Sequence, residues 1–494
     1  MDTEQSNEDV PMRAARRRAH PKRAILALLA LLLSVNLAAS LYQLPVNRVI
    51  ERRFCREYYT ANDPSVIGDD GSIDESFCKI DAVQQRLAWL MGIMETSWIV
   101  GDFIMTIPLG FVAEKYGRRV GLWLNIVPRL FMLAWTVVIG YFEEQLPLKA
   151  LIAGPALSVL GGDCVFNSIV YSLAASLTDD NVVRATYFSW TNAVSYVVTF
   201  VGPGLAGATM TIHLLLPLWI GICLLLLAIP IIALIEDPTH TPPAGEDEQR
   251  RPLISSPTLK AQTSKASLFS PVTERIRTLH SIIRSHPRNF ALLLVSFFLT
   301  SLASSDTKLL AQYISKRYNW LFAWAGYLLS AKAIVNFTLL TIVIPSILRS
   351  RSTSDPSQSR SLSDRDNVRY ARICLAVSVL GALAIASSVT VWLLIPSLLL
   401  YSFGAALPVF TLGLLKSPSV SPKDSDELTN STGAETHIFS IVMMVKTLGS
   451  LVGAPLMATL WVRGIATGAL GVPYLVSAAL YVTAIIVFAG MRVR

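Results

Sequence analysis

The chain of 494 residues is strongly apolar: 52% of its residues are hydrophobic and 15% are charged, against about 25% charged residues in a typical soluble protein. Its net charge of +8 does not indicate nucleic-acid binding, because the basic residues are scattered between apolar stretches and form no patch interleaved with aromatic side chains. Composition thus argues against a soluble globular protein and predicts a chain that crosses a lipid bilayer many times.

Twelve apolar stretches approach the ~20 residues that span a bilayer, which predicts an all-α membrane protein with two bundles of six helices. The predicted spans are 24–46, 87–112, 119–141, 148–176, 185–209, 213–235, 290–313, 320–347, 370–392, 394–415, 436–462 and 471–491. The least distinct division falls between the ninth and tenth spans. The predicted domains are a tail (1–23), an N-terminal bundle (24–235) with a long loop at 47–86, a linker (236–289) and a C-terminal bundle (290–494).

Lys and Arg are concentrated in the tail, in the loops that follow even-numbered spans and at the C-terminal end. The positive-inside rule therefore predicts that both termini are cytoplasmic. Loop 47–86 is an exception, because it carries six basic residues on the predicted outer side. The first apolar stretch is too long for a typical signal-peptide core, so we expect it to be retained as a membrane anchor.

The five cysteines fall into two groups. Cys164, Cys223 and Cys374 lie inside predicted spans, where we expect them to pack as small apolar residues. Cys55 and Cys78 both lie in loop 47–86, and a disulfide between them is chemically permitted on an oxidising side of the membrane. Two unpaired thiols are the alternative.

The linker is rich in Pro, Ser and charged residues and cannot bury a core, so much of it is predicted to be disordered. Its last part, 272–288, has apolar residues at helical spacing among arginines, which predicts an amphipathic helix on the inner membrane surface. A glycosylation sequon begins at Asn430, on the predicted cytoplasmic side, where it should stay unmodified.

The turn between the second and third spans reads Gly110-Phe-Val-Ala-Glu-Lys-Tyr-Gly-Arg-Arg119. Such a cationic turn must lie outside the hydrocarbon, on the side where Lys and Arg accumulate. It resembles the signature G-x-x-x-[DE]-[RK]-x-G-[RK]-[RK] of the loop between helices 2 and 3 in the major facilitator superfamily, and every defined position matches. An ordinary basic turn is the alternative. The resemblance implies the major facilitator fold: two pseudo-symmetric six-helix repeats, with the substrate bound at their interface near the midplane.

Physical reasoning assigns the two glycines of the signature: Gly110 permits close helix approach, and Gly117 permits the tight turn. By resemblance, the charged residues of this loop and of the loop between spans four and five form a cytoplasmic network that breaks when the halves rock. Its members are Glu114, Lys115, Arg118, Arg119, Asp179, Asp180 and Arg184. Charges that only anchor helix ends in headgroups are the alternative. The corresponding loop of the second half keeps only Arg349-Ser350-Arg351.

The fifth span contains Gly202, Pro203, Gly204 and Gly207. The string matches a dinucleotide fingerprint, but that motif needs a βαβ unit, which cannot form inside a membrane span. It also resembles the Gly-Pro element on helix 5 of drug/proton antiporters, which implies a kinked helix that packs tightly against its neighbour. Generic kinked packing is the alternative.

Ionisable residues inside membrane spans are costly and by default are functional candidates. Asp163, near the midpoint of the fourth span and preceded by two glycines, is our first candidate for a proton carrier; Glu95 and Asp102 are the second. Basic residues that could face a central cavity are Arg129, Lys308, Lys332 and Lys446. The alternative for each carboxylate is neutralisation by a buried cation, which we favour for Asp306 with Lys308.

The sequence contains no nucleotide-binding or zinc-hydrolase motif and no histidines at metal-ligand spacing. We therefore expect no enzyme activity, no cofactor and no metal, and an ion gradient as the energy source. The stretch from Arg52 to Tyr59, with Cys78-Lys79 and 85–90, also resembles fungal facilitators that accompany secondary-metabolite pathways and distantly resemble proton-coupled folate transporters.

The expected function is proton-coupled export of a small organic molecule by a monomeric transporter in a lipid bilayer. Proton-coupled uptake of a nutrient or organic anion is the alternative, and a non-transporting receptor is a third possibility. We expect the plasma membrane as the location, with the vacuole or another endomembrane as the alternative.

Overall fold

The computed structural model describes residues 21–69, 71–143, 145–177, 181–234, 288–339, 342, 364–415 and 431–491. The tail up to residue 20, residues 235–287 and the loops at 343–363 and 416–430 lie outside these ranges. The predictions of a disordered linker and of an amphipathic helix at 272–288 therefore concern residues that the structure describes only from Arg288, where α10 begins, and Asn430 lies outside the described residues.

The N-terminal half is built from five long helices and one interrupted segment. The long helices are α2 (Pro21–Asn62), α3 (Asp81–Tyr116), α4 (Arg118–Tyr141), α7 (Asn181–Met210) and α8 (Leu216–Leu234). Between α4 and α7 lie η3 (Leu148–Ile152), α5 (Ala153–Ala156), η4 (Leu157–Leu160) and α6 (Asp163–Ser176).

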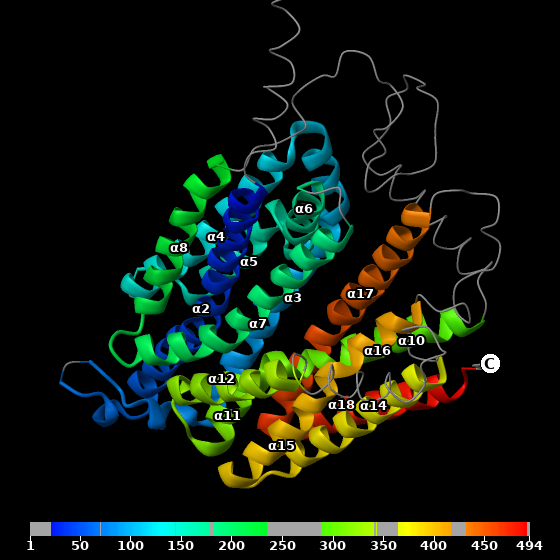
Figure 1. The fold of residues 1–494 in the computed structure, drawn as a ribbon. Coiled ribbons are helices and arrows are strands. Elements are labelled where there is room, and N and C mark those ends of the chain that lie inside the picture. The colour runs from blue at the N-terminus through cyan, green and yellow to red at the C-terminus, as the bar shows by residue number, and fades with distance from the viewer. Residues whose placement is uncertain are drawn as a thin grey trace, which may run out of the picture.

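The C-terminal half repeats this helical character. Its elements are α10 (Arg288–Ala303), η6 (Ser304–Leu309), α11 (Leu310–Tyr318), α12 (Phe322–Thr338), α14 (Asp364–Ser387), α15 (Val391–Phe403), η8 (Gly404–Ala406), α16 (Leu407–Leu415), α17 (Ser431–Ala466) and α18 (Val472–Ala489). No strand occurs in the ranges that the structure describes. Figure 1 shows the two halves as separate helical groups, one blue to green and the other yellow-green to red.

Every predicted span overlaps helix in the structure, and in the described part of the chain nine helices are long and apolar enough to cross a bilayer. The tenth span appears as a shorter apolar helix, Val391–Ala406. The fourth span is broken into short pieces, and the eighth is described as α12 only to Thr338. The all-α membrane fold is confirmed, while the full count of twelve spans stays a prediction.

Much of the segment 47–86, predicted to be a loop, is helical in the structure. Helix α2 runs on to Asn62 and α3 begins at Asp81, so only residues 63–80 connect them. At 1.5 Å per residue the 42 residues of α2 reach about 63 Å, roughly twice the ~30 Å hydrocarbon thickness. The helix continues because its polar end is stabilised by side-chain pairs: Arg48 binds Glu51, and Arg56 binds Glu143.

Each half has its own apolar core. In the N-terminal half it includes Leu31, Leu122 and Phe166, and in the C-terminal half Tyr313, Trp461 and Tyr474. Large apolar side chains also lie on the outside, with Trp392 84% exposed and Ile486 66% exposed. Apolar side chains on the outer surface of a bundle of apolar helices match a lipid environment rather than water.

The two halves meet along two helix pairs, α7 against α12 and α3 against α17. Small residues make this approach possible. A Cβ on Gly207 would lie 2.6 Å from the carbonyl oxygen of Ala323, and a Cβ on Gly92 would lie 2.5 Å from the Cβ of Ala458. These contacts bring the ionic side chains of the two halves to a common interface.

Candidate functional site: ionic groups at the interface of the halves

An ion pair joins α4 to the start of α6. Arg129 donates from Nη2 to Asp163 Oδ1, and from Nε to Asn125 Oδ1 at 2.9 Å. Trp98 on α3 donates to Asp163 Oδ2 at 3.3 Å, and the guanidinium of Arg129 also lies over the Trp98 ring, 5.6 Å from its centroid. The side chain of Arg129 is 3% exposed, whereas that of Asp163 is 49% exposed. A carboxylate that is paired yet accessible can exchange a proton.

The break in the fourth span positions Asp163. The chain leaves its helix at Gly161 and Gly162, where a Cβ would collide with the backbone of α4 and with the carboxylate of Asp102. Helix α6 restarts at Asp163, and Asn125 donates to the carbonyl of Gly162 at 2.8 Å. The two glycines that mark this segment in the sequence thus allow three elements to pack closely around it.

Asp102 has a different environment. Its residue is 7% exposed, and its Oδ1 accepts from the backbone N–H of Cys164 at 3.2 Å. This N–H belongs to the first turn of α6, where backbone donors lack helical partners and the helix dipole favours a negative charge. Asp102 therefore caps α6 from another helix, which is the structural alternative to a role as proton carrier.

A second ion pair crosses the interface between the halves. Lys308, in η6, lies 3.0 Å from Glu95 Oε1 on α3, with side chains 56% and 26% exposed. Sequence reasoning considered Lys308 as the partner of Asp306, and the structure corrects this. Asp306 is fully buried and instead accepts from the hydroxyl of Tyr401 at 2.9 Å. A hydroxyl donor takes the place of the predicted cation because Lys308 points to the opposite half.

The other two candidate lysines lie in the C-terminal half. Lys332 Nζ lies 5.5 Å from the centroid of the Tyr401 ring, next to the hydroxyl that binds Asp306. Lys446, on α17, accepts a hydrogen bond from Ser301 through its backbone carbonyl, and its ammonium has no ion-pair partner among the described residues.

The signature loop is described in part. Gly117 connects α3 to α4 with φ of +98°, a backbone conformation that residues other than glycine rarely adopt. Arg118 and Arg119 begin α4. Gly110, Glu114 and Lys115 lie in the last turns of α3. Asp179 and Asp180 lie outside the described residues, and Arg184 is placed only as part of α7. The charge network therefore stays a prediction.

The Gly-Pro run of the fifth span lies on α7 and packs against α12 of the other half. Gly326 of α12 approaches the carbonyl of Pro203, and a Cβ on Gly204 would lie 2.8 Å from Ser330 Oγ. Ser330 also donates to the carbonyl of Phe200 at 2.7 Å, within the turn that Pro203 weakens by lacking an N–H. The Gly-Pro run is therefore tightly packed, and the helix against which it packs, α12, belongs to the other half.

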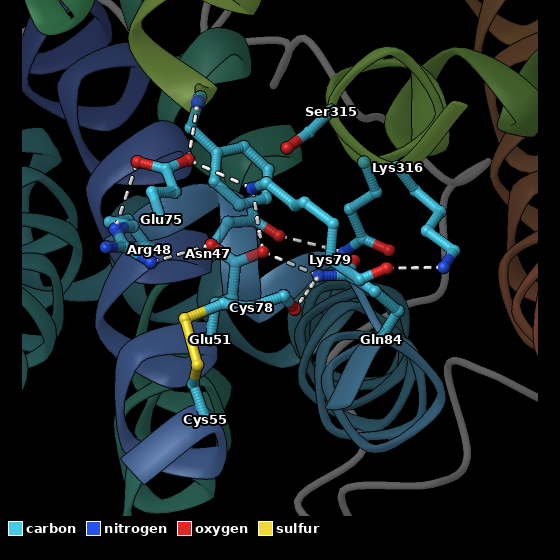
Figure 2. Close-up of polar contacts among 12 residues, drawn as sticks. Asn47, Arg48, Glu51, Cys55, Glu75, Cys78, Lys79, Gln84, Ser315 and Lys316 are labelled. Carbon is cyan, nitrogen blue, oxygen red and sulfur yellow. Dashed lines mark hydrogen bonds and ion pairs between the residues drawn. A yellow bond between two sulfur atoms is a disulfide. The ribbon is translucent and has the colours of Figure 1, made fainter. Parts of the chain in front are cut away.

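A disulfide joins Cys55 and Cys78, as the sequence analysis proposed. It ties the short connection between α2 and α3 to the polar end of α2, and Figure 2 shows it below a dense polar cluster. Within this connection Asp74 caps η2 (Glu75–Lys79) by accepting from the backbone and hydroxyl of Ser76, and these two hydrogen bonds hold the pKa of Asp74 below its usual value.

Sequence reasoning missed the centre of this cluster. Glu51, fully buried, accepts from Lys79 at 2.8 Å, from Gln84 at 2.5 Å and from Arg48 at 2.9 Å (Figure 2). Glu75 lies 2.9 Å from Lys79 and 3.1 Å from Arg48. One sign of this cluster was visible in the sequence. Glu51 and Lys79 lie in segment 47–86, which has more basic residues than the positive-inside rule predicts for the outer side of the membrane.

From this cluster several contacts reach the C-terminal half. Glu75 accepts from the backbone N–H of Phe322 at 2.9 Å, and Lys316 lies 2.6 Å from Asp81 and also binds the carbonyl of Lys79. We call the set Glu75, Lys79, Asp81, Lys316 and Phe322 the disulfide-side clasp. It holds the two halves together at the end of the molecule that carries the disulfide.

Comparison with known proteins identifies the family. The model of the Major Facilitator Superfamily matches residues 80–454. The MFS-type transporter aprT of Aspergillus flavus is 28% identical over 397 residues, which is 79% of this chain and 74% of that protein. The MFS efflux pump atnC of Emericella nidulans is 25% identical over 453 residues, 91% of this chain and 83% of that protein.

The fold is also similar to solved structures. The crystal structure of the human organic anion transporter MFSD10 covers 95% of this chain and 99% of its own, with a TM-score of 0.57 and 16% identity. At that identity the similarity concerns the fold alone. Because the family model matches most of the chain and two transporter relatives align with most of it, this protein belongs to the Major Facilitator Superfamily of membrane transporters.

Proposed function

We propose that this transporter exports a small organic molecule in exchange for protons. The observation that carries the proposal is the ion pair between Glu95 and Lys308, which joins the halves and remains accessible. A proton that binds Glu95 abolishes its charge and with it the attraction to Lys308. Proton binding would thus loosen a contact that must change when the halves rock.

Asp163 provides a second proton-binding group on the same side of the interface. Its carboxylate pairs with Arg129, and its exposed fraction of 49% leaves it open to water or substrate. We propose that substrate and proton compete at these two carboxylates. Asp102, engaged with the first turn of α6, is assigned a structural role in this proposal.

Export is favoured over uptake by the relatives and by the interface. The fungal relative atnC carries the name of an efflux pump. The Gly-Pro run resembles that of drug/proton antiporters and packs tightly against the other half, as a barrier to leakage requires.

Uptake of an organic anion is the second candidate. Lys446 favours it, since an intramembrane ammonium without an ion-pair partner among the described residues can attract an anion. Lys308 contributes less to this function than the sequence suggested, because Glu95 already neutralises it.

The experiment is substrate-driven proton movement in proteoliposomes that hold the purified protein and an internal pH indicator, with a panel of fungal metabolites and drugs. Antiport predicts that proton movement opposes substrate movement. Glu95→Gln should abolish substrate-driven proton flux while the protein stays folded, which its thermal unfolding midpoint verifies. Glu57→Gln removes a 65% exposed carboxylate elsewhere and should change nothing.

Two outcomes would contradict the proposal. Proton and substrate moving in the same direction would establish symport and favour uptake. Normal coupling in Glu95→Gln would exclude this ion pair from the proton pathway.

We further propose that both termini are cytoplasmic, that the protein acts as a monomer and that it resides in the plasma membrane. The disulfide supports this orientation, because its bond is stable on the oxidising side of a membrane. Protease protection of a tagged N-terminus in sealed cells tests the orientation. Fluorescence microscopy of a tagged chain tests the location, and light scattering in detergent tests whether the protein is a monomer. Cleavage of the tag from outside would overturn the orientation.

A further inference from the structure

A groove of about 650 Å³ lies between the start of α14 and the end of α18, remote from the ionic groups at the interface. Its apolar lining residues are Val368, Ile373, Ala376, Ile485 and Met491. Its polar lining consists of three arginines, Arg365, Arg369 and Arg372. A groove with basic side chains at its mouth and apolar side chains along its floor suits a ligand that has both an anionic group and an apolar part.

The three arginines share one face of α14, because their spacing of four and three residues matches the helical period. Arg365 and Arg369 are exposed and have no ion-pair partner among the described residues. Arg372 donates from Nη2 to the carbonyl of Phe488 at 2.9 Å, while its buried Nε has no partner in the described part of the chain. The nearby acidic residue Asp366 does not line the groove.

The groove lies at the end of the molecule opposite the disulfide-side clasp. The far end of α14 is followed by Ser388, whose carbonyl accepts from Arg317, the neighbour of the clasp residue Lys316. The 24 residues of α14 separate the two ends by about 36 Å, close to the thickness of a bilayer with part of its headgroups. The arginines therefore lie at headgroup level, on the same side as the end of α18.

The apolar floor continues onto surface that faces lipid. Ile373 is 48% exposed, Leu380, two turns along α14, is 57% exposed, and Ile486 on α18 is 66% exposed. A ligand that enters from the bilayer can thus lie along this floor without leaving the hydrocarbon.

We propose that this groove binds an anionic phospholipid. Its phosphate oxygens accept hydrogen bonds from the guanidinium groups of Arg365, Arg369 and Arg372, whose planar forks match phosphate geometry. Its acyl chain lies against Ile373 and Ile485. This choice of lipid rests on the orientation proposed above, in which this end of the molecule faces the cytoplasm. The cytoplasmic leaflet holds the anionic lipids, and basic pockets between membrane helices on that side suit their headgroups.

The test is lipid retention by the full-length protein in detergent, measured by native mass spectrometry with added phosphatidylinositol or phosphatidylcholine. Wild type should retain phosphatidylinositol in preference to phosphatidylcholine. The double variant R365Q/R369Q should bind phosphatidylinositol about 30-fold more weakly. It leaves Arg372 and its hydrogen bond to Phe488 intact, so folding should persist, which the thermal unfolding midpoint verifies.

R288Q is the matched control, because it removes another exposed arginine, at the start of α10 and outside the groove. It should retain the lipid as wild type does. Equal retention by wild type and R365Q/R369Q, or equal loss in R288Q, would overturn the proposal. Stabilisation by inorganic phosphate alone, with displacement of the lipid, would reassign the site to a free phosphate group.

Discussion

At the scale of single residues, the intramembrane charges separate into groups with different partners. Asp306 is buried and accepts a hydrogen bond from Tyr401, and Asp102 caps α6. Protonation of either carboxylate would disturb these structural hydrogen bonds. Asp163 and Glu95 are paired with cations and remain accessible. Accessibility together with a cationic partner distinguishes carboxylates that can take part in coupling from those that hold the fold.

The pair of Arg129 and Asp163 should show strong coupling in a double-mutant cycle. D163N leaves the buried guanidinium of Arg129 without its ionic partner and should lower the free energy of unfolding by about 1–3 kcal/mol. R129Q/D163N removes both charges and should recover much of this loss. Chemical denaturation in detergent measures each variant. Additive effects of the two substitutions would show that the pair is not energetically coupled.

At the scale of elements, the contact between α7 and α12 depends on residues without side chains. An added Cβ at Gly207 would meet a backbone carbonyl of the other half at 2.6 Å, which cannot turn away as a side chain can. The Gly-Pro run predicted a tightly packed helix, and the structure supplies its partner. The sequence alone could not name α12, because small residues fit any close neighbour.

Gly207→Ala should therefore push α7 from α12 and reduce transport, with a cost to stability of about 1–3 kcal/mol. Gly140→Ala is the control: it adds the same methyl group within a helix, but the nearest atoms belong to the flexible side chain of Leu215. Transport rates and unfolding midpoints of both variants test this. Equal effects at the two glycines would show that the contact between the halves is not critical.

At the scale of the whole molecule, the disulfide-side clasp holds the two halves together at one end. The disulfide fixes the segment that carries Glu75 and Lys79 to α2, so the clasp residues keep their positions. We propose that transport proceeds by alternating access, in which this end opens and the clasp separates while the opposite end closes.

Loss of the disulfide should weaken both the fold and the closed clasp. C55S/C78S frees a segment with a sequence separation of 23 residues and should lower stability by about 3 kcal/mol. It should also increase labelling by a membrane-impermeant maleimide of a cysteine introduced by S315C, at a buried position next to the clasp residue Lys316. C223S, which removes a thiol outside the disulfide, should match wild type. Unchanged labelling in C55S/C78S would show that the clasp closes without the bond.

The sequence by itself determined the membrane class, the helical spans and the family signature, because hydrophobicity and loop charge are local properties that each segment carries alone. It also located Gly117, where the backbone adopts a positive φ, and it offered the disulfide as one of two alternatives. Gly161 and Gly162 stood out as a place that could admit water or substrate, but the structure fills the space beside them with the backbone of α4 and the carboxylate of Asp102. The ends of α2 and α3 escaped it, since polar helical extensions beyond the bilayer have no hydrophobic pattern.

Only the tertiary structure decided which charges meet. Glu75 reaches the N–H of Phe322 across 247 residues of sequence, and Lys308 pairs with Glu95 of the opposite half rather than with Asp306 nearby. No spacing rule encodes such a pair, because the two partners belong to different helical bundles. Their distance depends on how the bundles pack, and that packing places the ammonium of Lys308 3.0 Å from the carboxylate of Glu95.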